Sequence, residues 1–376
     1  MTVRILHFAD LHLDRSFASL GMASSEAIKR REELRATLRR IVDLAIERNV
    51  QAVTVGGDLY ERDRATLDTG NFIVKEFSRL APRQVLVAPG NHDPYTPDSL
   101  YRRVEWPDNV RVFDSPQWRP VPVAEGVTVW GAGHIGPETR EDLLAHLHVD
   151  RKDTAVALLH GSNTSFVPEG KVAHCPFSAE EVEATGATFL LLGHYHQARL
   201  SPASRPRCAY PGSPEPLGFD ETGPHYVLVL DVDDAEVAPE LVSINQTFYE
   251  SHEVDVSGMN TSDQVREAIW SLPIRQQASG TLVRVVLAGQ PEPELDIDNA
   301  ALMAATAQHF RYLDIVDRSE PAFDLDAIRG ETTTRGAFVR MMEERIAAAC
   351  EPDRSILAKA LIYGLQTFEG REARRR

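Results

Sequence analysis

Apolar and polar positions alternate in blocks through the first half of the chain. Short runs rich in Val, Leu, Ile and Phe are typical of strands buried on both faces, and they lie at 5–9, 53–55, 85–87, 156–159 and 189–192. Between them, apolar residues recur with a helical period, which predicts helices at about 25–49 and 66–80. Prolines interrupt the strands expected between 110 and 135, which favours edge hairpins. Alternating strands and helices indicate an α/β fold.

The pattern changes in the second half of the chain. Strands joined by turns are expected at 207–210, 225–231, 241–246 and 251–256. From about residue 258 the patterns mix, with helices near 261–271 and 299–309 and strands at 281–288 and 311–317. Two helices close the chain, one at about 335–350 and one after Pro352 with Asp353 as its cap. We therefore expect three parts, 1–255, 256–330 and 331–376.

Each of the buried runs leads into polar residues that bind metals. These residues are Asp10 and His12, Asp58, Asn91 with His92 and Asp93, His160, and His194 with His196. In α/β sheets such side chains gather where the carboxyl ends of the strands meet. Two divalent ions about 3.5–4 Å apart bind phosphate oxygens and lower the pKa of a bound water. Mixed imidazole and oxygen donors suit Mn, Fe or Zn. The chain therefore predicts a two-metal phosphoesterase site.

The alternative for each piece taken alone is a turn or a surface residue, because Gly, Asn and Asp favour tight reversals. Their joint occurrence in chain order favours a site. The remaining histidines match no motif, and their default is a structural or solvated role. They are His7, His134, His146, His148, His174, His225, His252 and His309.

The order of these motifs resembles the calcineurin-like metallophosphoesterase superfamily, and more narrowly its SbcD-type DNA repair nucleases (YhaO-like branch). The narrower resemblance rests on Phe8–Asp14 and Tyr210–Glu221 and covers roughly the first two-thirds of the chain. It implies a four-layer α/β/β/α sandwich over 1–255, a small α+β cap domain over 256–330 and helices over 331–376 that dock on a partner.

The resemblance also implies roles for the site residues. One ion would be held by Asp10, His12, Asp58 and His196, and the other by Asp58, Asn91, His160 and His194, so that Asp58 bridges both. His92 would protonate the leaving oxygen, and Asp93 would orient His92. Glu61 stands where many relatives have Asp or His, so the acidic character is kept but a His role cannot be transferred to it.

Composition limits the nucleic-acid interpretation. The 376 residues include 40 basic and 56 acidic side chains, a net charge of −16, which argues against a protein that covers DNA along its whole surface. A local basic track remains possible, and the alternative is solvated surface. Candidates are Lys29, Arg30, Arg31, Arg35, Arg39 and Arg40, then Arg102 and Arg103, then Arg199, Arg205 and Arg207. The three cysteines fit neither a disulfide framework nor a zinc motif, which favours reduced thiols and a cytoplasmic location. No apolar run is long enough to span a membrane.

We therefore expect a metal-dependent DNA nuclease (exonuclease or endonuclease) of a double-strand-break repair complex, with two divalent ions, Mn²⁺ above others. The alternatives are a phosphomonoesterase or cyclic-nucleotide phosphodiesterase of the same superfamily, and a scaffold without activity. By resemblance the partners are DNA, a second copy of the chain and an SbcC-like SMC-type ATPase. The homodimer surface would include Leu67, Phe72, Ile73, Phe77, Leu100, Tyr101 and Val104. The ATPase would dock on the last helix, through Ile356, Leu357, Ala360, Leu361, Ile362, Leu365 and Phe368, unless that helix packs on its own cap.

Overall fold

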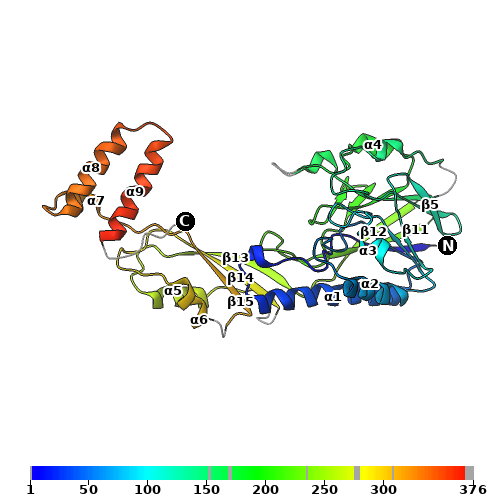
Figure 1. Ribbon diagram of the computed structural model, residues 1–376, viewed down its shortest axis with the longest axis horizontal. Helices are drawn as coiled ribbons and strands as arrows, with labels where there is room; N and C mark the ends of the chain where they lie inside the picture. The colour runs from blue at the N-terminus through cyan, green and yellow to red at the C-terminus, as the bar shows by residue number, and fades with distance from the viewer. Residues whose placement is uncertain are drawn as a thin grey trace. The chain divides into compact units, whose positions relative to one another are not determined.

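The computed structural model describes residues 2–150, 154–167, 172–233, 236–274, 280–306 and 309–368. Contacts divide the chain into two compact units, Met1–Tyr249 and Glu250–Arg376. Figure 1 draws the first unit from blue to yellow-green and the second from yellow to red. The terminal arginines Arg371, Arg374, Arg375 and Arg376 lie outside the described residues.

The first unit contains two mixed sheets of six strands each. The first sheet has the order β12-β11-β1-β2-β3-β4. Its strands are β12 (Glu236–Ser243), β11 (Tyr226–Asp233), β1 (Val3–Phe8), β2 (Ala52–Val55), β3 (Gln84–Val87) and β4 (Val110–Val112). The second sheet has the order β5-β6-β7-β8-β10-β9. Its strands are β5 (Arg119–Ala124), β6 (Val127–Gly131), β7 (Thr154–His160), β8 (Phe189–Gly193), β10 (Cys208–Tyr210) and β9 (Arg199–Ser201).

The two sheets pack face to face around one core. Ile5 and Leu86 of the first sheet share a hydrophobic cluster with Val156 and Leu158 of the second. The alternate β7 residues, such as Leu159, face a second cluster on the outer side, as the two-residue period of a strand requires. That outer face is covered by α4 (Ala179–Ala184), while α1 (Ser24–Glu47) and α2 (Leu67–Ser78) lie along the opposite side of the sandwich (Figure 1). The expected sandwich is confirmed.

The second unit holds a small third sheet and five helices among the described residues. Its strands are β13 (Phe248–Asp255), β14 (Thr281–Ala288) and β15 (Tyr312–Asp317), and β14 runs parallel to β15. Helices α5 (Ser262–Trp270) and α6 (Asn299–Thr306) pack with this sheet in one apolar cluster. Helices α7 (Leu325–Arg329), α8 (Thr334–Ala348) and α9 (Asp353–Phe368) share another.

Several predicted elements differ in detail. The strand expected at 251–256 is β13, which joins the third sheet rather than the sandwich. Along the chain, the boundary between the two compact units falls within this strand. The strand expected at 241–246 is displaced to Glu236–Ser243. The Pro-broken segment forms the edge hairpin β5–β6 as predicted, while β4 pairs in parallel with β3. Short helices such as α3 (Leu100–Arg103) lack the length that a period needs.

Candidate metal centre

The site lies where the strand ends of the two sheets meet. Strands β1, β2 and β3 are neighbours running in parallel in one sheet, and β7 and β8 are parallel neighbours in the other. Their carboxyl ends carry all the residues predicted as ligands. The loops approach so closely that a Cβ at Gly193 would overlap the carbonyl oxygen of Gly56. Only glycine permits that approach.

Four of the predicted ligands have a left-handed backbone. The φ angles are 56° at Asp10, 51° at His12, 50° at Asp58 and 116° at His194. Side chains other than glycine adopt this region at a cost, and such strain is concentrated at functional sites. Hydrogen bonds between the loops hold it in place: the amide of Asp10 donates to the carbonyl of Gly57 (3.0 Å), and that of His12 donates to the carbonyl of Asp58 (2.9 Å).

The side chains of the predicted ligands converge, with Asp58 at the middle. The Oδ2 atom of Asp58 lies 3.8 Å from Nε2 of His12 and 3.5 Å from Nε2 of His160. The same nitrogen of His12 is 3.3 Å from Nε2 of His196. Nε2 of His160 is 2.9 Å from Oδ1 of Asn91. One carboxylate oxygen thus lies between two groups of donor atoms.

The other two predicted ligands close the cluster. Asp10 is fully buried and accepts hydrogen bonds from the backbone amide of His194 at 3.0 and 3.1 Å. The ring of His194 lies 5.1 Å from that of His160, centroid to centroid. Ligand atoms of Asp10 lie within 4.8 Å of those of His12 and His196, and also of those of Asp58 and His160. All seven predicted ligands are therefore brought together.

Hydrogen bonds on the outer ring nitrogens orient the histidines. The Nδ1 atom of His12 is 2.9 Å from Oε1 of Glu61, and that of His196 is 2.7 Å from Oε1 of Glu221. The Nδ1 atom of His160 is 2.8 Å from the carbonyl oxygen of Gly56. These oxygens accept only, so each Nδ1 carries a proton, and the neutral form of each ring keeps its lone pair on Nε2, which faces the cluster. This is the arrangement of imidazoles that bind metals.

Electrostatics also fit a pair of cations. Burial raises the pKa of Asp10 to about 6 and that of Asp58 well above its ordinary value. Burial lowers the pKa of His12 and of His194 to about 3 and keeps His160 neutral. Burial disfavours the charged form of these carboxylates, and a divalent ion would stabilise that form. The neutral imidazoles of His12, His160 and His194 can bind the same ion without repelling it. The buried His and Asp clusters fit a dimetal site.

His92 lies beside these ligands, and its partner is not the predicted one. Its side chain is 42 % exposed, and Nδ1 is 2.9 Å from Oε2 of Glu61. The hydrogen bond to Glu61 raises the pKa of His92 to about 9. Asp93 was expected to orient His92, and this expectation is wrong. The buried Asp93 carboxylate instead accepts from the amides of Gly90 (2.7 Å) and Leu59 (2.7 Å).

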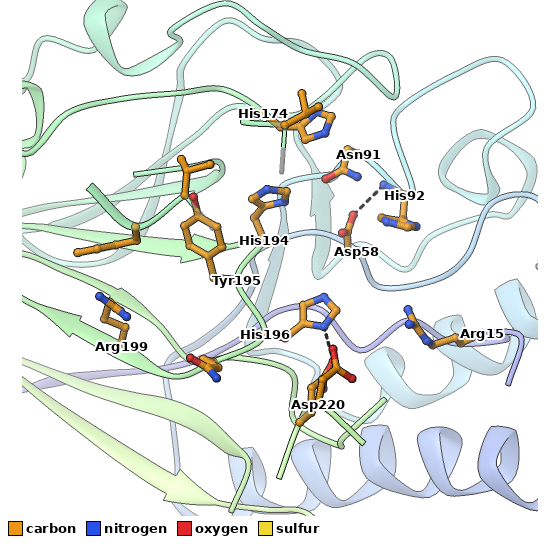
Figure 2. Close-up of a pocket in the computed structure, with 15 residues that line it drawn as sticks. Arg15, Asp58, Asn91, His92, His174, His194, Tyr195, His196, Arg199 and Asp220 are labelled. Atoms are coloured by element: carbon orange, nitrogen blue, oxygen red, sulfur yellow. Dashed lines mark hydrogen bonds and ion pairs between the residues drawn. The ribbon is translucent and has the colours of Figure 1, made fainter. Parts of the chain in front are cut away.

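A cavity of about 530 Å³ opens over the cluster. Figure 2 shows Asp58 and His92 facing it, with Arg15 and Arg199 on opposite sides of His196. The guanidinium of Arg199 stacks over the ring of Phe166 at 4.2 Å. The volume is in the range of small-ligand sites, and its lining carries Arg15 and Arg199 together with the carboxylates of Asp58, Asp220 and Glu221.

Sequence reasoning missed three residues at the site. Glu61 and Glu221 orient ligands, although neither residue was assigned that role. His174 lines the cavity with its ring 5.4 Å from that of His194. Glu221 ends the Tyr210–Glu221 stretch, so a signal existed for it; nothing in the pattern marked His174.

The stretch Tyr210–Glu221 is built around Glu221. The second oxygen of Glu221 accepts from the hydroxyl of Ser213 (2.7 Å) and the amide of Leu217 (3.0 Å). The amide of Ser213 also donates to the carbonyl of His196 (3.0 Å). The stretch therefore supports the last histidine of the cluster.

Three arginines of the basic cluster predicted on α1 are paired with carboxylates of the same protein. Arg30 is fully buried, with its guanidinium 3.5 Å from Glu215, and Arg40 lies 3.1 Å from the same carboxylate. Arg35 pairs with Asp68 at 2.7 Å. A buried arginine loses its hydration, and a carboxylate partner offsets that cost. These arginines do not form a free track for DNA.

Most of the predicted dimer surface is also buried within the protomer. Relative exposure is 0 % for Ile73 and Phe77, 2 % for Leu100 and 3 % for Tyr101. Leu67 remains 46 % exposed. Among the described residues, no helix is both long and apolar enough to cross a membrane.

Fold and site together define a metal-dependent phosphoesterase. The model of the calcineurin-like phosphoesterase family matches residues 3–198, and the chain belongs to that family. It is similar to the metallophosphoesterase YhaO of Bacillus subtilis, with 28 % identity over 82 % of this chain and 79 % of that protein. It is also similar to the DNA double-strand break repair protein Mre11 of Methanopyrus kandleri, with 24 % identity over 89 % of this chain and 77 % of that one. The family predicted from the motifs is confirmed.

Among solved structures, the chain is similar to TT1561 of Thermus thermophilus, with 13 % identity, a TM-score of 0.37 and coverage of 64 % of this chain and 99 % of that one. It is also similar to a dimetal phosphatase from Danio rerio, with 11 % identity, a TM-score of 0.38 and coverage of 64 % and 99 %.

Proposed function

We propose that the protein is a two-metal nuclease that hydrolyses phosphodiester bonds of DNA. The observation that carries this proposal is the extent of the match to Mre11, which covers 89 % of this chain. Residues 3–198, matched by the general family model, cover only part of the first unit. The likeness to a DNA repair protein therefore extends into the second unit, which a phosphomonoesterase would not need.

The lining of the cavity supports a polyanionic substrate. Arg15 and Arg199 lie on opposite sides of the ligand cluster (Figure 2), where the phosphates on either side of a scissile bond would lie. Phe166 and Tyr195 add aromatic surface beside Arg199. Arginine binds phosphate through several N–H donors, and aromatic rings stack on bases. A monoester offers no flanking phosphates to such groups.

In this proposal Asp10, His12, Asp58 and His196 would hold one ion, and Asp58, Asn91, His160 and His194 would hold the other. Two such ions, with Mn²⁺ as the expected metal, would supply Lewis acidity and lower the pKa of a bound water. His92, exposed to the cavity and hydrogen-bonded through Nδ1, holds a proton on Nε2 for the leaving oxygen. Asp93 fixes the loops of Gly90 and Leu59.

The test is an assay of the purified protein with Mn²⁺ on linear DNA, a phosphomonoester and a cyclic nucleotide. We expect cleavage of DNA, and activity on the monoester alone would contradict the proposal. Arg199→Ala should weaken oligonucleotide binding roughly 10–100-fold, the effect of losing a hydrogen bond to a charged group. Arg119→Ala is the matched control, because Arg119 pairs with Asp114 on an exposed surface.

We also propose that α8 and α9 dock on an SbcC-like ATPase, with 256–330 as a cap. Leu361 and Leu365 of α9 are buried against Val339 and Met342 of α8. Ile356 is 63 % exposed, whereas Phe368, which is 45 % exposed, lies against Phe338 of α8 with ring centroids 5.6 Å apart. Ile356 is therefore the large apolar residue of α9 that is available to a partner. Truncation at Glu351 would expose the α8 core, so Ile356→Asp is the sharper variant. Ile356→Asp should remove co-purification with the ATPase. Leu365→Asp should unfold the α8–α9 hairpin, so it shows how a misfolded protein behaves in the same assay.

A homodimer through α2 is part of the same proposal. Leu67 is the exposed large apolar residue of the predicted surface, while Phe72 of the same helix lies under Arg35 and Arg39. Light scattering at micromolar concentration should show a dimer, and Leu67→Glu should shift it to monomer. A wild-type monomer would contradict the proposal.

A further inference from the structure

Glu61 connects the ligand cluster with His92. Its side chain is 18 % exposed, and its two oxygens accept from two different histidines: Oε1 from Nδ1 of His12 and Oε2 from Nδ1 of His92, each at 2.9 Å. The two rings lie edge to face, 4.8 Å apart. One carboxylate therefore fixes an imidazole of the metal centre and the imidazole that faces the substrate cavity.

The backbone around Glu61 is tied to the same two loops. The amide of Glu61 donates to the carbonyl of Leu13 (2.9 Å), next to His12. The amide of Arg62 donates to the carbonyl of His92 (3.2 Å). The backbone position of Glu61 is thus set independently of its side chain. A shift of the carboxylate that keeps its hydrogen bond to one histidine would therefore strain its hydrogen bond to the other.

We propose that Glu61 is a positioning residue that couples ion binding at His12 to the orientation of His92. The ring of His12 would be fixed by an ion held at Nε2, and its Nδ1 would in turn fix Glu61 through the hydrogen bond to Oε1. Glu61 then holds His92 with Nδ1 as donor and Nε2 toward the cavity. The inference rests on the proposed role of His92 as proton donor, and it adds that this group is set in place by the metal centre.

Glu221 provides a matched comparison within the same site. It accepts from Nδ1 of His196 at 2.7 Å, so it also orients a predicted ligand. Its other oxygen accepts from Ser213 and Leu217 rather than from a second imidazole. Loss of Glu221 should therefore weaken ion binding without a separate effect on His92.

A glutamine at either position tests the difference. An amide has one acceptor oxygen, whereas the carboxylate has two, so Glu61→Gln can accept from only one of its two histidines. Calorimetric titration with Mn²⁺ should show that Glu61→Gln and Glu221→Gln each weaken one ion by roughly 10–100-fold, the usual effect of losing such a partner. This readout needs no activity.

The second readout is the dependence on the leaving group. A nitrophenolate leaves without a proton, and the alkoxide released from DNA needs one. At saturating Mn²⁺, Glu61→Gln should slow hydrolysis of DNA, or of a small dialkyl phosphodiester, far more than that of bis-p-nitrophenyl phosphate. Glu221→Gln should slow both substrates alike. In Glu61→Gln/His92→Asn the selective loss should be no larger than in His92→Asn.

Three outcomes would overturn the inference. Equal leaving-group dependence in Glu61→Gln and Glu221→Gln would show that Glu61 does not act on His92. Three equivalents of Mn²⁺ in the wild type that fall to two in Glu61→Gln would make Glu61 a ligand, since its carboxylate, His12 and His92 lie close enough to hold an ion. Unchanged Mn²⁺ affinity in Glu61→Gln would break the link to His12.

Two further arms keep the result interpretable. If Glu61→Gln does not fold, Glu61→Asp keeps the charge on a shorter side chain and should show the same selective loss to a smaller degree. If the wild type hydrolyses only the small diesters, the nuclease proposal fails, and the leaving-group comparison on those diesters still decides the role of Glu61.

Discussion

The two halves of the metal centre are supported in different ways. On the first side, His12 and His196 are oriented by carboxylates, Glu61 and Glu221. On the second side, His160 is oriented by the backbone carbonyl of Gly56. A side-chain partner can be removed by substitution and a backbone carbonyl cannot. A single substitution outside the ligands can therefore alter the ion affinity of the first half. In the second half the orientation of His160 is fixed by the backbone.

The largest effect should come from the residue that both halves share. Asp58 Oδ2 lies within 3.8 Å of His12 and 3.5 Å of His160. Asp58→Ala should therefore abolish hydrolysis and reduce the binding of both ions. Elemental analysis of the washed protein checks it: two equivalents of metal in the wild type that stay at two in Asp58→Ala would contradict the shared position.

His92 should separate chemistry from ion binding. It has no place among the predicted ligands, and its contacts are with Glu61 and with Oδ1 of Asp58 through its backbone amide (2.8 Å). His92→Asn should keep both ions and slow DNA hydrolysis by ~10²–10⁴-fold. Loss of an ion in this variant, measured by the same elemental analysis, would make His92 a ligand.

Glu221→Gln should distinguish the two halves directly. It should weaken the ion near His196 by roughly 10–100-fold and leave the ion near His160 unchanged, so a Mn²⁺ titration should resolve one shifted and one unshifted step. Glu183→Gln is the control, because Glu183 pairs with Arg207 at 3.4 Å on the surface. Two equally shifted steps would mean that the halves are not independent.

The smallest effect should come one contact further out. Ser213 donates its hydroxyl to Glu221 at 2.7 Å and does not touch His196 with its side chain. Ser213→Ala should weaken the same ion only by about 2–10-fold, the equivalent of one ordinary hydrogen bond. Calorimetry under the same conditions measures it. A loss as large as that of Glu221→Gln would show that the stretch, rather than its carboxylate, supports His196.

Sequence patterns predicted the sandwich. They also identified the candidate ligands, because each ligand motif follows a buried strand. Asp10 follows β1 and Asp58 follows β2, so the chain position already determines the place in the sheet. Contacts between segments far apart in the chain produce no such pattern in the sequence. Arg30 pairs with Glu215 across 185 positions, and the pattern of a helix rich in arginine allows a basic track or a solvated surface without indicating this buried pair.

Asp93 illustrates the same limit at short range. Its neighbour His92 suggested a contact, but adjacent side chains of a loop point in different directions. Asp93 is buried and binds the hydroxyl of Tyr101 at 2.6 Å, while His92 turns to Glu61. The resemblance implied no role as a ligand partner for Glu61, so its position became visible only from its two hydrogen bonds.

The central claim is that one carboxylate oxygen serves two ions. Low-temperature electron paramagnetic resonance of the protein loaded with two equivalents of Mn²⁺ tests it most directly. Because Asp58 Oδ2 lies between His12 and His160, we predict the spectrum of an exchange-coupled Mn²⁺ pair, and its loss in Asp58→Ala. Two independent mononuclear signals in the fully loaded wild-type protein would contradict the account.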